Sequence, residues 1–202
     1  MLGILAVLRF TKGIAPLRNY EKVSLPGLPG PTGLIHRLDG SDQKQRPISY
    51  GRYPELKGDN ELVLPRAWET DMTAGRYAAV AHLWALDQLK QEDPNGAKER
   101  KNALFRAIVI PFFSALILIA LVGLKRIPVT PGVAVFLAIW AFCSFSAFPG
   151  QFREWKAAEI AKKGLQNAGL WPQLSTDANA VDVCLKALYW CRVAGFRRIL
   201  PR

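Results

Sequence analysis

Two apolar segments decide the fold of this chain: ALFRAIVIPFFSALILIALVGL at residues 103–124 and PGVAVFLAIWAFCSFSAFPG at residues 131–150. A helix of about 20 apolar residues can cross the hydrocarbon core of a bilayer. The first segment carries a single charge, Arg106, near the end where a long side chain can reach the headgroups, and the second carries none. We therefore expect Leu104–Leu124 and Pro131–Gly150 to be transmembrane helices.

The short link between the two segments predicts a helical hairpin with both flanks on one side of the membrane. Pro131 suits the first turn of the second helix. Basic residues close to the span ends set the orientation. The link has Lys125 and Arg126, whereas the flanks have Lys98, Arg100, Lys101, Arg106, Arg153, Lys156, Lys162 and Lys163. Both termini should therefore face the cytoplasm or the matrix, with the hairpin in the bacterial cytoplasmic membrane or the mitochondrial inner membrane.

The composition narrows the class of partner. The chain has 202 residues, with 27 Lys and Arg against 16 Asp and Glu, and a formal net charge of +11. In a membrane protein, this charge favours anionic lipid headgroups and other subunits of a membrane complex as partners. No nucleic-acid-binding motif accompanies the charge, so nucleic acid is not an expected partner. Cys143, Cys184 and Cys191 are too few for a disulfide scaffold.

The sequence before the hairpin divides by composition. Residues 1–23 are apolar and basic and predict an N-terminal anchor segment. Residues 24–69 are rich in Pro and Gly and predict extended loop, with one short strand near Glu61–Leu64. Residues 70–102 contain a helical pattern from Asp71 to Lys90.

The sequence after the hairpin, residues 151–202, predicts two amphipathic helices. One is Arg153–Ala168, and the other is Asp177–Gly195 with Thr176 or Asp177 as its cap. The second is so apolar that we expect it to lie against the membrane or another protein. The fold class is then mainly α, with a two-helix transmembrane hairpin at 103–150, flanking amphipathic helices and a Pro/Gly-rich extended N-terminal region.

Four short elements occur in an order that resembles a known family. They are Thr32-Gly33, LVLP at 62–65, AAVAHLWALDQ at 78–88, and, after the apolar segments, EWKAAEIA at 154–161. This order resembles the bacterial membrane-embedded neutral zinc metallopeptidases, whose pattern runs Thr-Gly, Leu-x-Pro, Ala-His-Glu-x-Gly-His-Ala-x-Gln, two spans, and Glu-Phe-Asp-Ala-Ser-x-x-Ala. The resemblance covers roughly residues 20–195. It implies that 78–88 correspond to the zinc-binding helix and that Glu154 stands where the family supplies a carboxylate ligand.

The departures from the family pattern bear on function. A helical zinc site needs two histidines one turn apart, with a glutamate between them that activates the zinc-bound water. His82 occupies the first histidine position, but Leu83 stands at the glutamate position and Leu86 at the second histidine position. The resemblance therefore implies a degenerate member with no catalytic residue, metal or cofactor, in which His82 and Glu154 are vestigial candidates for metal ligands.

The same residues have simpler interpretations. A lone histidine on an alanine-rich helix, such as His82, is more often a packed or interfacial side chain than a metal ligand. Glu154 can pair with nearby basic residues at the membrane surface. His36 has no companion ligands in its Pro/Gly-rich stretch and predicts a solvated or structural role.

No other motif for chemistry is present in the sequence, which lacks a phosphate-binding loop and a nucleophile elbow. The apolar segments also lack the buried charges that mark an ion path. The leading hypothesis is a non-catalytic, pseudo-metallopeptidase-like integral membrane subunit with a structural or scaffolding role in a larger membrane complex. The alternatives are a zinc-dependent membrane peptidase with an unusual ligand set and a membrane-tethered assembly factor.

Overall fold

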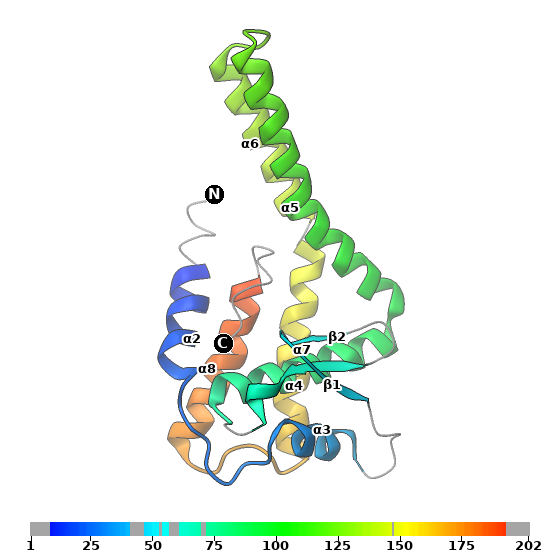
Figure 1. The fold of residues 1–202 in the computed structure, drawn as a ribbon, viewed down its shortest axis with the longest axis vertical. Coiled ribbons are helices and arrows are strands. Elements are labelled where there is room, and N and C mark those ends of the chain that lie inside the picture. Colours follow the sequence, from blue (N-terminus) through cyan, green and yellow to red (C-terminus); the bar gives the residue numbers. More distant parts are fainter. Residues whose placement is uncertain are drawn as a thin grey trace. The chain divides into compact units, whose positions relative to one another are not determined.

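The computed structural model describes residues 9–40, 47–52, 54–56, 61–69, 72–146 and 148–192. Helices dominate these residues (Figure 1), which confirms the prediction of a mainly α protein. The chain forms two compact units. The core unit comprises Met1–Glu92 and Glu154–Arg202, and the hairpin unit comprises Asp93–Arg153.

Helix α4 (Ala74–Glu92) is the centre of the core unit and agrees with the helical pattern expected from Asp71 to Lys90. Its side chains are buried on every side from Tyr77 to Asp87. A helix that is apolar all round needs other elements around it, and the many alanines of α4 leave room for their close approach. The other helices of this unit are η1 (Arg9–Ile14), α2 (Ala15–Tyr20), α3 (Pro31–Asp39), α7 (Phe148–Asn167, from Glu154 onward) and α8 (Ser175–Arg192).

A small sheet in the core unit contains the expected strand. Strand β3 (Leu62–Pro65) confirms the prediction near Glu61–Leu64 and lies between β1 (Ile48–Gly51) and β2 (Glu55–Leu56). It pairs parallel with β1 and antiparallel with β2. The three residues Leu62, Val63 and Leu64 are all buried, as expected for a central strand covered on both faces. A three-residue 3₁₀ turn, η2 (Arg66–Trp68), follows and buries Trp68.

Helix α3 corrects the expectation of extended loop for its part of residues 24–69. Gly30 precedes the helix with extended backbone, and Pro31 takes the first position, where its missing N–H costs no hydrogen bond. Gly40 ends the helix at a φ of 74°, a conformation that glycine adopts easily. Leu34 and Ile35 are buried in the core. These few apolar contacts, together with the end signals, stabilise a short helix that periodicity alone does not reveal.

Helix α8 is covered by its own chain, so the expectation that it lies against a membrane or another protein is wrong for its buried face. Val181, Cys184, Leu185 and Leu188 are buried where α8 packs against α4, α2 and η1. The N-terminal segment 9–20 supplies η1 and α2 for this packing, and residues 1–8 of the expected anchor lie outside the described residues. Because α8 begins at Ser175, Thr176 and Asp177 lie inside its first turn and not at its cap.

The hairpin unit consists of α5 (Pro94–Gly123) and α6 (Val129–Ser146), which lie side by side and run in opposite directions (Figure 1). Asp93 caps α5 because its Oδ1 accepts the Gly96 N–H at 3.0 Å, and Pro94 takes the first helical position. Pro131 lies in the first turn of α6, as expected. Among the residues between 109 and 146 whose burial the structure describes, the buried ones are Pro111, Gly132 and Cys143.

The expected transmembrane character of the hairpin depends on the length and hydropathy of its helices. In the part of the chain that the structure describes, no helix is both long enough and apolar enough to span a bilayer. The two helices of the expected hairpin are therefore present, but the structure does not support its transmembrane character.

Candidate functional site: a buried histidine–glutamate pair

The two residues singled out by the family resemblance meet inside the core unit. His82 on α4 and Glu154 on α7 are 72 positions apart, and the distance between His82 Nε2 and Glu154 Oε2 is 2.8 Å. His82 is 0% exposed and Glu154 is 4% exposed. The alternative that Glu154 pairs with basic residues at the membrane surface is therefore wrong in its location, because the carboxylate lies in the protein interior.

The local sequence of each helix directs these side chains inward. On α4 every neighbour of His82 is buried, including Ala81 and Leu83. On α7, Ala157, Ala161 and Leu165 follow Glu154 at helical spacing and are fully buried, so Glu154 begins the stripe with which α7 faces the core. The hydrogen bond between these two side chains links α4 to α7.

The electrostatics of the pair follow from its burial. A carboxylate moved out of water loses its hydration, and a buried charge is tolerated only with a hydrogen-bonded or oppositely charged partner. An ionised Glu154 can only accept hydrogen bonds, so His82 Nε2 then carries the hydrogen of the 2.8 Å contact. The contact thus pairs one polar atom of each side chain, His82 Nε2 and Glu154 Oε2, in an interior of alanine and leucine.

The residues around the pair do not fit a zinc ion. A catalytic zinc needs three protein ligands and an open position for water. Leu83 and Leu86, at the glutamate and second histidine positions of the family pattern, are buried apolar side chains. Among the residues that the structure describes, no group of three or more His, Cys, Asp or Glu side chains is placed to hold a metal. No catalytic step through a metal can be derived from this arrangement.

The other sequence elements of the resemblance lie elsewhere in the core unit. Thr32 and Gly33 form the first turn of α3, and the stretch 62–65 forms β3. His36 lies in the last turn of α3, exposed to solvent, and takes no part in the pair.

Two further polar contacts in the core unit were not foreseen from the sequence. Trp84 Nε1 donates to Asp39 Oδ1 at 2.8 Å, and the Tyr77 hydroxyl donates to the Leu170 carbonyl oxygen at 2.8 Å. Burial raises the pKa of Tyr77, which keeps this hydroxyl protonated as a donor. These residues are far apart in the chain, so no local pattern relates them.

Two contacts lie beside the ends of the hairpin. In the hairpin unit, the Arg153 guanidinium donates to the Asp93 carboxylate and, at 3.1 Å, to its carbonyl oxygen. In the core unit, Lys156 Nζ lies 4.0 Å from Glu92 Oε2. The hydrogen bond from Gly96 to the Asp93 carboxyl, aided by the Arg153 charge, lowers the pKa of Asp93. The Asp-Pro step at 93–94 is a helix-start signal from which this cap could have been predicted.

No model of a known protein family, no curated protein and no solved structure matches this chain. The resemblance to the zinc metallopeptidases therefore stays a prediction. It rests on short motifs, two of whose residues, His82 and Glu154, are in contact in the structure.

Proposed function

We propose that this protein is a non-catalytic membrane subunit with a structural or scaffolding role in a larger membrane complex. The observation that carries the proposal is the buried pair of His82 and Glu154, which are hydrogen-bonded to each other in an apolar core. A general base or a metal ligand has to reach substrate or water. Side chains this deeply buried and already engaged are suited to holding α4 against α7, and not to catalysis.

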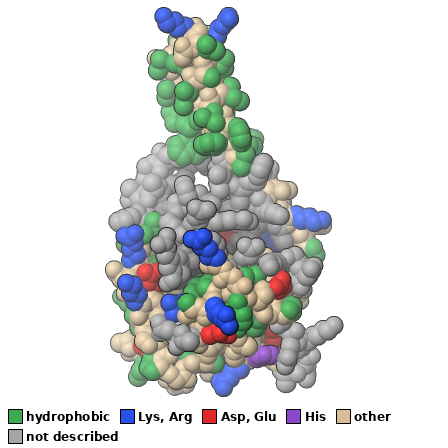
Figure 2. Space-filling view, viewed as in Figure 1, with side chains coloured by type: hydrophobic (Ala, Val, Ile, Leu, Met, Phe, Trp, Pro, Cys, Tyr) green, Lys and Arg blue, Asp and Glu red, His purple; other side chains and the backbone are tan. Residues whose placement is uncertain are grey.

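The surface of the hairpin supports the membrane part of the proposal. Large apolar side chains on both helices are exposed, from 41% for Ile110 to 79% for Phe145. Figure 2 shows apolar side chains, in green, along the shaft that the two helices form. They include Ile110, Phe112, Phe113, Leu116, Ile117 and Ile119 on α5, and Val133, Val135, Leu137, Phe142 and Phe145 on α6. An apolar surface of this extent needs a cover other than water.

A bilayer is the cover that suits this surface. The exposed apolar positions of α6 run from Val129 to Phe145, which is about 24 Å at 1.5 Å per residue and most of the hydrocarbon thickness of about 30 Å. The apolar segments of the sequence, 103–124 and 131–150, extend past the residues whose side chains the structure describes. Two spans return the chain to its starting side, so both termini would face the cytoplasm or the matrix, in a bacterial cytoplasmic or mitochondrial inner membrane.

Resistance to extraction tests the membrane anchor. Membranes containing the protein are washed with alkaline carbonate, and we expect the protein to stay in the pellet. Phe113→Glu with Phe142→Glu should release it, because each exposed side chain lies near the centre of a span, where a carboxylate costs about 3 kcal/mol. The matched control, Lys12→Glu with Lys163→Glu, changes two exposed residues of the core unit and should stay in the pellet. Release of the parent protein would refute the anchor.

Companions in the membrane test the subunit role. After extraction in a mild detergent, native electrophoresis should show the protein in a band much heavier than one chain, with defined companion proteins. Migration as a lone chain would argue against a subunit. Presence in partly built complexes but not in the mature one would instead indicate the assembly factor. Measuring the zinc content of the purified protein tests the alternative of a zinc-dependent peptidase. One zinc per chain that is lost in His82→Ala would overturn the non-catalytic assignment.

A further inference from the structure

The turn at the tip of the hairpin has an unusual backbone for its sequence. Arg126 N–H donates to the Leu121 carbonyl oxygen and Lys125 N–H to that of Val122, both at 2.9 Å. These two bonds define a helix end of the Schellman type, in which the residue after the cap is left-handed and usually glycine. Here that residue is Lys125, with a φ of 57°, the only described non-glycine residue with positive φ.

A lysine in this conformation costs free energy that glycine would not, because its Cβ crowds the following carbonyl. A backbone outlier of this kind points to a use for the side chain that occupies it. The next residue, Arg126, is also basic, and both are exposed. The tip therefore presents two adjacent cations where the backbone alone would favour an uncharged residue.

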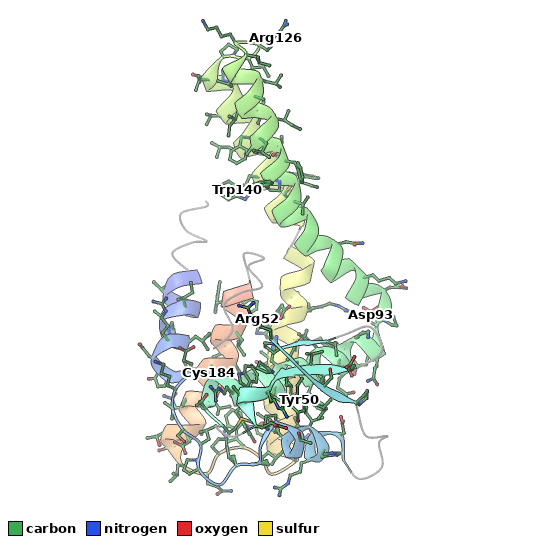
Figure 3. All side chains as sticks on the ribbon, viewed as in Figure 1. Tyr50, Arg52, Asp93, Arg126, Trp140 and Cys184 are labelled. Carbon is green, nitrogen blue, oxygen red and sulfur yellow. The ribbon has the colours of Figure 1, made fainter. Side chains whose placement is uncertain are left out.

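The position of the tip indicates which environment surrounds the side chains of Lys125 and Arg126. Between 107 and 124 on one side and 127 and 150 on the other, the sequence carries no charge. Figures 2 and 3 show the basic tip, with Arg126, at the end of the apolar shaft that carries Trp140. Two adjacent cations are costly inside hydrocarbon, so a tip that carries them is excluded from the middle of a bilayer. If the shaft is in lipid, the tip reaches the opposite headgroup layer.

We propose that Lys125 and Arg126 form a binding site for the phosphate groups of anionic phospholipids in the headgroup layer opposite the one where the hairpin enters. This inference rests on the proposed membrane anchor. The αL lysine turns the chain so that consecutive side chains carry both charges at the end of the shaft. Anionic headgroups attract such cations, and a guanidinium can bind a phosphate through two hydrogen bonds.

Native mass spectrometry of the whole protein in detergent with equal amounts of phosphatidylglycerol and phosphatidylcholine tests the site. The parent should retain phosphatidylglycerol in preference, and Lys125→Gln with Arg126→Gln should lose this preference by on the order of tenfold. The control, Arg37→Gln with Arg66→Gln, removes the same charge from two exposed residues of the core unit and should keep the preference. An unchanged preference in the tip variant overturns the proposal.

A second pair of variants separates charge from turn geometry. Lys125→Gly relieves the backbone and removes one charge, so it should lower the lipid preference while leaving the helices intact. Lys125→Arg keeps the charge and should keep the preference. If Lys125→Gly prefers phosphatidylglycerol as strongly as the parent does, the lysine side chain does not contribute to lipid binding and the proposal fails.

Site-specific labelling separates failure of this inference from failure of the anchor. In sealed vesicles, a membrane-impermeant maleimide should label Lys125→Cys only from the side opposite to that which labels Lys98→Cys. If the protein resists carbonate but Lys125→Cys and Lys98→Cys are labelled from the same side, the hairpin is anchored in the membrane without placing its tip in the opposite headgroup layer. That result overturns the inference. A protein released by carbonate fails at the level of the anchor itself.

Discussion

The imidazole of His82 and the carboxylate of Glu154 lie 2.8 Å apart in a core made largely of alanine and leucine. Breaking a buried pair leaves one polar group without compensation, whereas replacing both members with apolar side chains removes the need for it. If the role of the pair is only structural, replacing one member should destabilise the protein strongly, whereas replacing both members should destabilise it much less. This distinguishes a packing role from a catalytic or metal-binding role.

A double-mutant cycle tests this at the residue scale. We expect His82→Leu or Glu154→Leu alone to lower the free energy of unfolding by about 3–5 kcal/mol, and the double variant to recover most of that loss. Denaturant unfolding measures each value. Glu159→Leu, an exposed glutamate on the same helix, is the matched control and should change stability little. A double variant as unstable as the sum of the singles would contradict the pairing.

At the scale of the elements, the carboxylate of Asp182 lies between two lysines and links α8 to α7. Asp182 on α8 accepts from Lys162 of α7 at 2.7 Å and from Lys186 of its own helix at 2.6 Å. Burial acts to raise the pKa of Asp182, but the two lysines outweigh it, and its pKa lies below the ordinary value of 3.8. Lys162 also lies over the Trp171 ring, 5.5 Å from its centroid. The contact between these helices therefore depends on an ionised carboxylate.

The pH dependence of stability follows from the direction of this shift. The folded state binds the Asp182 proton less tightly than the unfolded state, so the contribution is present above the unfolded pKa and is lost as the pH falls through the folded pKa. When the pH is lowered from about 6 to about 3, the thermal midpoint of the parent should fall further than the thermal midpoint of Asp182→Asn. Glu159→Gln, an exposed acid on α7, should follow the parent, and parallel curves for parent and Asp182→Asn would count against the ion pair.

For the molecule as a whole, the buried hydrophobic core found among the described residues lies in the core unit. The core unit is closed around α4, and Cys184 of α8 lies inside it (Figure 3), with burial raising its thiol pKa to about 12. The hairpin unit instead exposes many of the large apolar side chains that the structure describes in it. We expect the first to depend on its internal packing and the second on its surroundings.

Reactivity of the Cys184 thiol reports on the core unit alone. Labelling of the Cys184 peptide by a maleimide, measured by mass spectrometry, requires opening of the core. Leu188→Ala should speed it, because loss of this buried side chain costs about 2–5 kcal/mol. Phe142→Glu, on the exposed face of α6, should leave the labelling rate unchanged. Equal acceleration in both variants would show that the units are energetically coupled.

Local patterns were sufficient to predict the helices that form the bulk of the protein. The alanine-rich periodicity predicted α4, the apolar segments and the Pro131 signal predicted the helices of the hairpin, and the short apolar run near Glu61–Leu64 predicted β3. These features depend on residues within a few turns of each other, so the chain alone determines them. The short helix α3 was missed because its buried side chains pack against elements distant in the sequence, such as α4.

The sequence by itself determined the helical class, the hairpin and the choice of His82 and Glu154 as the residues to follow. Only the tertiary structure decided that α8 is covered by the N-terminal helices and that the histidine and the glutamate, 72 positions apart, meet in the interior. The physical reason is that periodicity reports which face of a helix is apolar, whereas the partner that buries this face is chosen by long-range packing.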